Sequence, residues 1–525
     1  MKSIKMLDCT LRDGGYCNQW QFGKENIHRI MQGLIESGID IIECGFLSNR
    51  ISVCCDSTKF CSLSDIENTI PDNCGNSMFV CMINYGEYEL DDIPLCDGSG
   101  ITGIRVAFHK KDLKEALDFC KGVQEKGYLV FVQAMVSLSY EDEEFLTLIR
   151  EINSFTPYAF YIVDSFGVMK RKDLLRLFYM VEHNLKDGIY IGFHSHNNMQ
   201  LAYSNAQAIV DNPTMRNIII DSSVYGMGRG AGNLNTELFV GYLNDSRGAT
   251  YLLKPLLNII DDILNGFYQQ NAWGYSLPNY LSAKHNIHPN YASYLDAKKT
   301  LTIEGIDELF SMMDEGKKVS YDKTYIERLY IQYMSLGQSK ETHLKELEER
   351  YAGKEVVLLA PGHSLVEEEE RIINFIDNMR LPVICINFDF DEVNPEFLFV
   401  SNRRRFKKLA VEKHNKCITT SNILSPDVYL NVEYKDLLNE ESSVRDNAGL
   451  MAIKFLMRLG VKKIYIAGMD GLSSDPTQNY VNKELNFYSN RELINMMNVG
   501  MGKVLNKYCK EIDIEFITKP KHIEI

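Results

Sequence analysis

Eight short apolar runs, rich in β-branched residues, recur through the first 230 residues and constrain the fold more than any other feature. Amphipathic stretches separate them, and this alternation predicts βαβ units with a parallel sheet. Each run is apolar almost throughout, which indicates strands buried on both faces. Eight such units predict a (β/α)8 TIM barrel, with a doubly wound open sheet as the alternative. The runs are Ile4–Cys9, Ile39–Phe46, Met78–Ile83, Ile101–Phe108, Tyr128–Val136, Phe160–Asp164, Ile189–His196 and Asn217–Val224.

The chain has 525 residues, more than one hydrophobic core usually organises, so further parts are expected after the barrel. Residues 251–350 are aromatic-rich and helical in pattern, which predicts a connector packed on the barrel. After residue 350 the strand–helix alternation restarts with EVVLLAPGHSL, PVICINFDF, EFLFVSN, KKIYIAGMDG and IEFIT. We therefore expect a barrel over residues 1–250, a helical connector over 251–350, and a Rossmann-like α/β domain over 351–525 whose role the sequence leaves open.

Charge and composition exclude several classes of function. A formal net charge of −15 disfavours nucleic acid and anionic membranes as partners, because both are bound mainly through Lys and Arg. The thirteen cysteines include no CxxC pair, so we expect reduced thiols rather than disulfides or a four-thiolate zinc site. The chain lacks a signal-peptide pattern and any long apolar window. We expect a cytoplasmic protein with a small-molecule substrate, and the sequence leaves a homodimer open.

The motif GFHSHNN places two histidines two residues apart on the seventh predicted strand. Residues with this spacing share a face, so His194 and His196 are expected to point into the barrel mouth and to share one metal ion. They also lie at the carboxyl end of the strand, where barrel enzymes place their active sites. The alternative is a pair of hydrogen-bonded structural histidines.

The motif LDCTLRDGG follows the first predicted strand, which neighbours the seventh across strand eight in a closed ring. Asp13 can supply a hard oxygen ligand to a metal, and Arg12 can stabilise a developing enolate. A surface ion pair at a turn is the alternative for this motif alone. Its predicted position at the same end of the barrel as the two histidines favours a metal centre of Asp13, His194 and His196.

The motif DSSVYGMGRGAGN leaves the eighth predicted strand. Its glycines can bind an anion through backbone N–H groups, and Asn233 can offer an amide oxygen to the metal. A tight connection without a ligand is the alternative.

The segments LDCTLRDGG, IIECGF, IRVAFHKKD, YIVDSFGVM, GFHSHNNMQLAYSNA and DSSVYGMGRGAGN occur in this order over residues 1–250. Together they resemble the metal-dependent aldolase and lyase superfamily of TIM barrels, which carries the HMGL-like or pyruvate carboxyltransferase domain. The strongest likeness is to the 4-hydroxy-2-oxovalerate aldolases. The resemblance implies metal ligation by Asp13, His194 and His196, with Asn233 as a ligand of the lyase branch. It further implies enolate stabilisation by Arg12 and a contact of Ser165 with the substrate carboxylate.

This chain departs from the aldolase pattern at one catalytic position. The aldolases carry a histidine base three residues after the metal-binding aspartate, whereas this chain has Tyr16. Tyrosine is a poor base at neutral pH but can donate a hydrogen bond to an alkoxide. The candidates for proton transfer are therefore Tyr16 as an acid, His109 after the fourth strand, and a water molecule on the metal. Glu43, at the end of the second strand, is expected to orient Arg12 or the waters of the metal, with a buried ion pair as the alternative.

Two candidate sites lie outside the barrel. Tyr291 in the connector is expected to cap the active site, as a downstream tyrosine does in the resembling aldolases, or else to pack in the core. In the motif APGHS, the residues Gly362, His363 and Ser364 follow a strand and precede a helix, so their N–H groups are a candidate phosphate or nucleotide site. The basic run Arg403–Lys408 is expected to form a solvated face.

These observations favour a class II aldolase that acts reversibly on a 4-hydroxy-2-oxoacid, giving pyruvate or a related 2-oxoacid and an aldehyde. The metal would act as a Lewis acid on the enolate, and the mixed oxygen and nitrogen donors favour Mn²⁺ over Mg²⁺ or Zn²⁺. Two alternatives stay open: a Claisen-type lyase or synthase that uses an acyl-CoA, and a nucleotide-sensing regulatory protein with a decayed barrel. The related aldolases pass the aldehyde to a dehydrogenase, but the different pattern after this barrel gives no reason to assume that partner.

Overall fold

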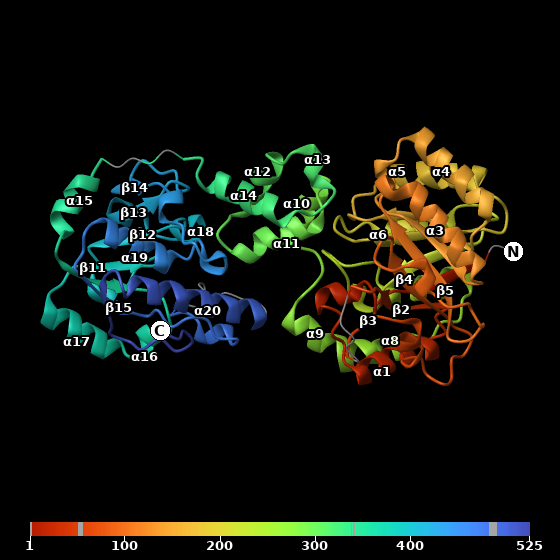
Figure 1. Ribbon diagram of the computed structural model, residues 1–525, viewed down its shortest axis with the longest axis horizontal. Coiled ribbons are helices and arrows are strands. Elements are labelled where there is room, and N and C mark those ends of the chain that lie inside the picture. Colours follow the sequence, from red (N-terminus) through yellow and green to blue (C-terminus); the bar gives the residue numbers. More distant parts are fainter. Residues whose placement is uncertain (1–2, 51–55, 338, 340–341, 482–490) are drawn as a thin grey trace. The chain divides into compact units, whose positions relative to one another are not determined.

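The computed structural model describes residues 3–50, 56–337, 339, 342–481 and 491–525 (Figure 1). The chain forms two compact units. The first comprises Met1–Ser293 and Lys318–Tyr321, and the second comprises Tyr294–Lys317 and Asp322–Ile525. The helices expected as a connector are thus shared between the two units. The division of the chain at residues 250 and 350 stays a prediction.

A closed ring of eight parallel strands forms the first unit, in the order β1, β2, β4, β5, β6, β7, β8 and β9, with β9 paired to β1. The short β3 (Lys59–Phe60) is an addition that pairs with β2. Each predicted run coincides with one strand of the ring to within one or two residues at each end, so the TIM barrel is confirmed. The strands of the ring are β1 (Ile4–Asp8), β2 (Ile41–Leu47), β4 (Met78–Asn84), β5 (Ile101–Phe108), β6 (Leu129–Ala134), β7 (Ala159–Asp164), β8 (Tyr190–Ser195) and β9 (Ile218–Ser222).

The barrel strands are mainly apolar because both of their faces are buried. In β1, Met6 packs in the cluster shared with the surrounding helices, whereas the next residue, Leu7, packs with side chains of the other strands. This second cluster, which includes Val80, Phe131 and Ile219, fills the interior of the ring. The barrel is therefore a packed core, and a reactive site is expected at the carboxyl ends of the strands.

Helices alternate with the strands around the barrel and continue beyond it (Figure 1). Among the described residues, no helix is both long and apolar enough to cross a bilayer. The described cysteines are free thiols, as expected, and of these Cys509 alone is exposed. The helices are α1 (Lys24–Glu36), α2 (Leu63–Glu67), α3 (Leu113–Glu125), α4 (Asp142–Phe155), α5 (Arg171–Asn184), α6 (Ala202–Asp211), α7 (Thr236–Arg247), α8 (Leu253–Ile259), α9 (Asn265–Gln270), α10 (Leu277–Lys284) and α11 (Pro289–Lys298).

The second unit contains a parallel sheet in the order β14, β13, β12, β11, β10, β15 and β16. Five of these strands were predicted from the sequence, whereas β13 (Cys417–Thr420) and β14 (Leu430–Val432) were not. The others are β10 (Glu355–Leu359), β11 (Val383–Ile386), β12 (Phe397–Val400), β15 (Lys463–Ala467) and β16 (Asp513–Phe516). The helices from residue 303 onward are α12 (Ile303–Ser311), α13 (Glu315–Lys318), α14 (Lys323–Met334), α15 (Leu344–Tyr351), α16 (Ser364–Glu367), α17 (Glu369–Met379), α18 (Arg403–Phe406), α19 (Ala448–Arg458) and α20 (Arg491–Tyr508).

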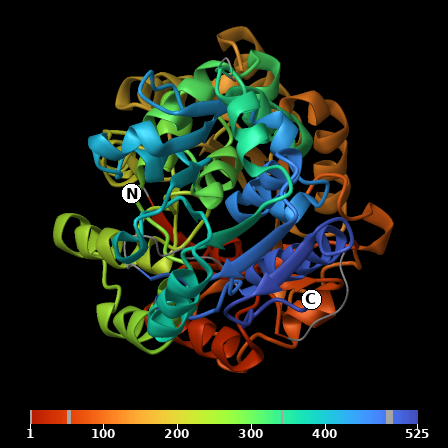
Figure 2. The same cartoon turned by 90° about the vertical axis from the view of Figure 1, so that its left-hand side faces the viewer.

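Helices cover both faces of this second sheet, whose blue and cyan strands face the viewer in Figure 2. Ile372 of α17 and Phe406 of α18 pack with Leu398 on one face. The neighbouring Phe399 faces the other side, where its ring lies 6.0 Å from that of Phe455 on α19. From β10 the chain moves outward on one side to β14 and then crosses to β15 on the other side of β10. This is a doubly wound, Rossmann-like arrangement, with a topological switch point between β10 and β15.

Candidate metal centre and active site

The three residues proposed as metal ligands meet at the carboxyl end of the barrel. Asp13 lies in the turn after β1, His194 lies in β8, and His196 directly follows β8. All three side chains are buried, and their potential ligand atoms lie within 4.8 Å of one another. The two imidazole rings share one face of the strand, with centres 5.1 Å apart. This is the only such cluster of three among the residues that the structure describes.

Each histidine directs its Nδ1 atom at a protein acceptor. Nδ1 of His194 lies 3.0 Å from Oδ2 of Asp221 on β9, and Nδ1 of His196 lies 3.3 Å from the backbone oxygen of Asp164. Such acceptors hold the proton on Nδ1 and leave Nε2 as the electron-pair donor, as in many histidine–metal sites. Nε2 of His196 is buried without a hydrogen-bond partner and lies 3.3 Å from Oδ2 of Asp13.

A network of buried charges supports these ligands. Glu43 accepts a hydrogen bond from Nε of Arg12 at 2.8 Å, and its Oε2 lies 2.8 Å from Nη1 of Arg105 on β5. Arg105 also pairs with Asp221, and Arg12 pairs with Asp13. Burial raises the pKa of both aspartates, but Arg12 beside Asp13 and Arg105 beside Asp221 outweigh it and hold both pKa values below the ordinary range.

The donor set fits a divalent cation. Asp13, Glu43 and Asp221 are three buried carboxylates, and among the described residues Arg12 and Arg105 are the arginines that pair with them. When both imidazoles are in the neutral form that binds a metal, one negative charge is uncompensated, and an unpaired buried charge is costly. A cation bound by one carboxylate and two imidazoles would compensate it.

Asn233 reaches the same place from the glycine-rich loop after β9. Its Nδ2 donates a hydrogen bond to Oδ2 of Asp13 at 2.7 Å, while its Oδ1 is buried without a partner. The backbone at Gly228 lies against the side chain of Asn233, so that a Cβ atom at Gly228 would lie 2.2 Å from Nδ2 of Asn233. The glycine is therefore needed for this packing. The role of Asn233 as an additional ligand stays a prediction.

Three side chains offer donors for a carboxylate or an enolate oxygen. Nη2 of Arg12 is buried without a hydrogen-bond partner. Ser165, which follows β7, accepts a hydrogen bond from the N–H of Val136 at 2.8 Å, so its own hydroxyl proton can be donated to a ligand. Arg229 donates to the backbone oxygen of Ser165 at 3.2 Å, and its Nε is buried without a partner. The sequence analysis missed Arg229, whose only signal was its place inside the glycine-rich motif.

Tyr16 lies in the short turn after Asp13, and its ring packs at 4.6 Å against that of Trp20. Its side chain is partly open to solvent, with 37% of the residue exposed. Desolvation of the hydroxyl by the side chains around it raises the pKa of Tyr16, although the guanidinium of Arg229, 5.3 Å from the ring centre, acts in the opposite direction. The hydroxyl therefore keeps its proton at neutral pH and can act as a donor.

Two neutral histidines lie near Arg229. His109 follows β5 as predicted, and burial lowers its pKa, with further lowering by Lys111 and Arg229. His288, which the sequence analysis missed, has its pKa lowered to about 3 by burial and then by Arg229, His109 and His196. Its ring lies 5.8 Å from that of Phe166, the residue after Ser165, and its neighbour Pro289 lies against Gly230 of the glycine-rich loop. The sequence contains little indication of a role for His288, because this residue lies more than 50 positions after the last barrel motif.

Tyr291, which was predicted to cap the active site, packs inside the first unit. The hydroxyl of Tyr291 donates to the backbone oxygen of Ser320 at 2.9 Å, and the residue is fully buried in the packing of the first unit. Its predicted capping role stays a prediction.

In the second unit, Gly362 donates its N–H to the oxygen of Gly468, and Ser364 donates its N–H to the carboxylate of Asp470. Two of the three N–H groups proposed for phosphate, the third being that of His363, thus have protein acceptors.

The HMGL-like family model matches residues 105–259. The barrel contains an HMGL-like domain. The matched HMGL-like segment includes Ser165, His194, His196 and Asn233, whereas Arg12 and Asp13 precede it. The resemblance inferred from the sequence motifs is therefore confirmed.

Several named proteins are similar to part of this chain. A 4-hydroxy-2-oxovalerate aldolase from Geobacillus genomosp. 3 is 27% identical over 247 residues, which cover 46% of this chain and 71% of the relative. An enzyme of the same name from Carboxydothermus hydrogenoformans is 28% identical over 244 residues, again covering 46% and 71%. The crystal structure of the N-terminal domain of a proposed aldolase from Bacteroides vulgatus is 28% identical, with a TM-score of 0.48, and the match covers 56% of this chain and 96% of that domain.

Proposed function

We propose that the barrel is a divalent-metal-dependent class II aldolase that cleaves or forms a 4-hydroxy-2-oxoacid, with pyruvate or a related 2-oxoacid and an aldehyde as the cleavage products. The relatives named as aldolases make this HMGL-like barrel a carbon–carbon lyase. The observation that carries the metal dependence is the buried Asp13, His194 and His196 cluster, with its uncompensated negative charge and the unpartnered Nη2 of Arg12.

The proposed chemistry divides between the cation and the side chains around it. A divalent cation, with Mn²⁺ our first choice, supplies a Lewis acid for the keto and carboxylate oxygens of the 2-oxoacid. When the bond between C3 and C4 breaks, its electron pair passes to C3 and the keto oxygen becomes negative. Arg12 donates to that oxygen through Nη2, and Glu43 positions the guanidinium. Ser165 and Arg229 bind the substrate carboxylate.

Cleavage also needs proton transfer, because the 4-hydroxyl loses a proton as the aldehyde forms and C3 gains one afterwards. The two neutral histidines, His109 and His288, are our candidates for this transfer. Nδ1 of His288 accepts the backbone N–H of Asn290 at 3.2 Å, so the neutral ring carries its proton on Nε2. Tyr16 then donates a hydrogen bond to the 4-oxygen, in place of the histidine that the related aldolases have at this position.

The test is the formation and cleavage of 4-hydroxy-2-oxoacids by the full chain. Metal-free protein is reloaded with Mn²⁺, Mg²⁺ or Zn²⁺ and incubated with pyruvate and a panel of aldehydes, and the products are identified by mass spectrometry. We expect addition products that require both the metal and pyruvate. A parallel incubation with acetyl-CoA and 2-oxoacids tests the Claisen alternative. Products in that second set alone, or none in either set with any metal, would contradict the proposal.

The two histidines give a separate prediction about proton transfer. We expect replacement of both His109 and His288 by alanine to lower kcat by roughly 10²–10⁴-fold, the usual contribution of general acid–base catalysis, while Mn²⁺ still binds. Tyr16→Phe is expected to cost less, since it removes one hydrogen bond. Steady-state rates across pH, together with Mn²⁺ titration, are the measurements. A double variant with the wild-type rate and pH profile would show that proton transfer runs through another group.

A further inference from the structure

The second unit contains a cavity of about 230 Å³ at the carboxyl ends of its parallel strands. Loops after four strands line it, including Gly362 after β10, Asn387 after β11, Asn402 after β12 and Gly468 after β15. This position coincides with the switch point between β10 and β15, where open α/β sheets bind their ligands. Nothing in the proposed barrel reaction uses this cavity.

The cavity depends on close contact between the two loops at the switch point. A Cβ atom at Gly362 would lie 2.2 Å from the backbone oxygen of Gly468. The N–H of Gly362 donates to that same oxygen at 2.8 Å, and Asp470 fixes Ser364 through its N–H. The turn after β10 is thus held to the loop after β15 by protein groups alone. A phosphate in this cavity would therefore need other donors than the N–H groups of Gly362 and Ser364.

The part of the lining at the start of α19 contains groups that can bind an anion. Asn447 caps α19 by accepting the N–H of Leu450 at 3.1 Å, and the first residues of this helix of eleven residues line the cavity. Arg405, Lys298 and Lys299 also line it. The N–H groups of a first helical turn attract phosphate when cationic side chains lie beside them.

The two carboxylates of the lining are already engaged by protein groups. Asp446 accepts the hydroxyl of Tyr330 at 2.7 Å and lies 3.6 Å from Nζ of Lys298. Asp470 accepts both the N–H and the hydroxyl of Ser364. Their negative charge is therefore partly offset. Lys299 in turn lies 2.6 Å from Asp296, which is outside the lining, so the part of the lining that favours an anion is the start of α19 with Arg405 beside it.

The other part of the lining is apolar and adaptable. It contains Met469 after β15, Met497 and Met501 of α20, and the aromatic ring of Tyr480. Thioether side chains adjust to irregular shapes and make favourable contacts with flat rings. A ligand that matches both parts carries an anionic group and a planar ring.

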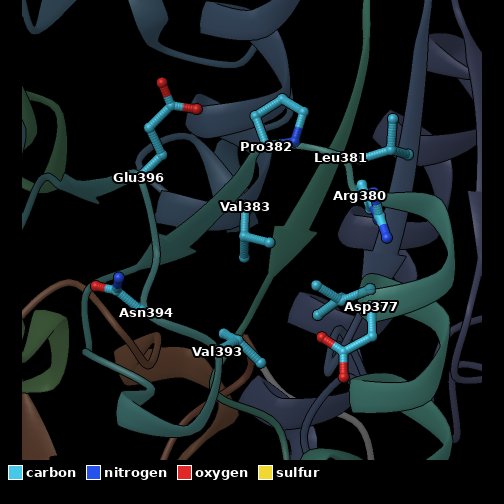
Figure 3. Close-up of a pocket in the computed structure, with 9 residues that line it drawn as sticks. Asp377, Arg380, Leu381, Pro382, Val383, Val393, Asn394 and Glu396 are labelled. Atoms are coloured by element: carbon cyan, nitrogen blue, oxygen red, sulfur yellow. The ribbon is translucent and has the colours of Figure 1, made fainter.

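Another depression in the same unit lacks these features. It measures about 580 Å³ and lies at the amino end of β11, where Figure 3 shows Asp377 and Glu396 on either side of Val383. Its lining comes from α17 and from the segments that lead into β11 and β12, so no loops converge there from the carboxyl ends of the strands. The switch-point cavity is therefore the stronger candidate.

We propose that the switch-point cavity binds a nucleotide. The phosphate lies at the start of α19 beside Arg405 and Lys299, and the base packs among the methionines. The site belongs to the second unit alone and does not depend on the activity proposed for the barrel.

The test is isothermal titration calorimetry on the full chain with AMP, GMP, CMP and UMP, the matching nucleosides, and inorganic phosphate. We expect at least one nucleotide to bind, and its nucleoside and free phosphate to bind at least ~10-fold more weakly. Arg405→Ala is expected to weaken binding by a similar factor. Arg404→Ala is the matched control, because this neighbour is exposed and does not line the cavity.

Circular dichroism establishes that each variant is folded, and Lys299→Ala provides a second test if Arg405→Ala is not. The proposal is overturned if no nucleotide binds at about 1 mM. It is also overturned if phosphate binds as tightly as every nucleotide, or if the folded Arg405 and Lys299 variants bind as well as the Arg404 control.

Discussion

His194→Ala is expected to abolish tight binding of Mn²⁺ and, with it, aldol cleavage. The substitution removes one of the three proposed ligands and leaves Asp13 and His196, too few to hold the ion against water. It also leaves Asp221 without its imidazole partner. We expect a loss of metal affinity larger than the ~10–100-fold that removal of an outer-shell partner costs. Titration of metal-free protein with Mn²⁺, followed by calorimetry, gives the affinity.

Two further variants test whether the loss of Mn²⁺ affinity depends on the proposed ligand itself. Asp221→Asn keeps all three ligands but weakens the hold on His194, so its affinity should fall by only ~10–100-fold. His28→Ala changes an exposed histidine of α1 and should bind like the wild type. Full cleavage activity of His194→Ala after chelation would contradict the metal centre.

Arg12→Ala is expected to lower kcat by roughly 10²–10³-fold, the effect of removing one donor to a developing oxyanion. Arg12 is also part of the buried charge network, and loss of one partner of such a network costs about 3–5 kcal/mol of stability. Glu43 keeps Arg105 as a partner, which should limit this cost. Rates are therefore measured together with the free energy of unfolding in denaturant and with Mn²⁺ affinity.

Arg12→Lys separates charge from geometry. It keeps the positive charge but lacks the planar fork that contacts Glu43 and Asp13 together, so we expect part of the rate to return. Arg29→Ala, which removes an exposed ion pair with Asp262, is the control for a lost surface arginine. A folded, metal-binding Arg12→Ala protein with the wild-type kcat would exclude Arg12 from the reaction.

The barrel could be predicted from sequence because its pattern is local. Every barrel strand is mainly apolar, and the spacing of His194 and His196 fixes their common face. Two strands of the second sheet were missed because neither is an apolar run: Cys417–Thr420 ends in two threonines, and Leu430–Val432 has an asparagine at its centre. The short β3 at Lys59–Phe60 was missed because two residues form no pattern.

The polar network behind the ligands could not be predicted, because closure of the ring sets its contacts. Arg105 looks like an ordinary strand residue, yet it pairs with Asp221, which lies 116 positions later in the chain. The proposed roles of Arg229 and His288 likewise depend on neighbours that are distant in the sequence and are brought together by the fold. The local sequence also predicted that the N–H of Ser364 donates a hydrogen bond to a phosphate. In the structure this N–H donates to Asp470, in the loop after the adjacent strand β15.

Exchange of the methyl protons of pyruvate for deuterium tests the metal centre most directly, because it requires proton removal at C3 but no aldehyde. Proton NMR of pyruvate in D₂O follows the exchange. We predict exchange that requires both the protein and Mn²⁺, stops on chelation, and is lost in His194→Ala. Exchange that persists in the chelated protein, or that no divalent metal supports while pyruvate still binds, would contradict a metal-dependent aldolase centre at Asp13, His194 and His196.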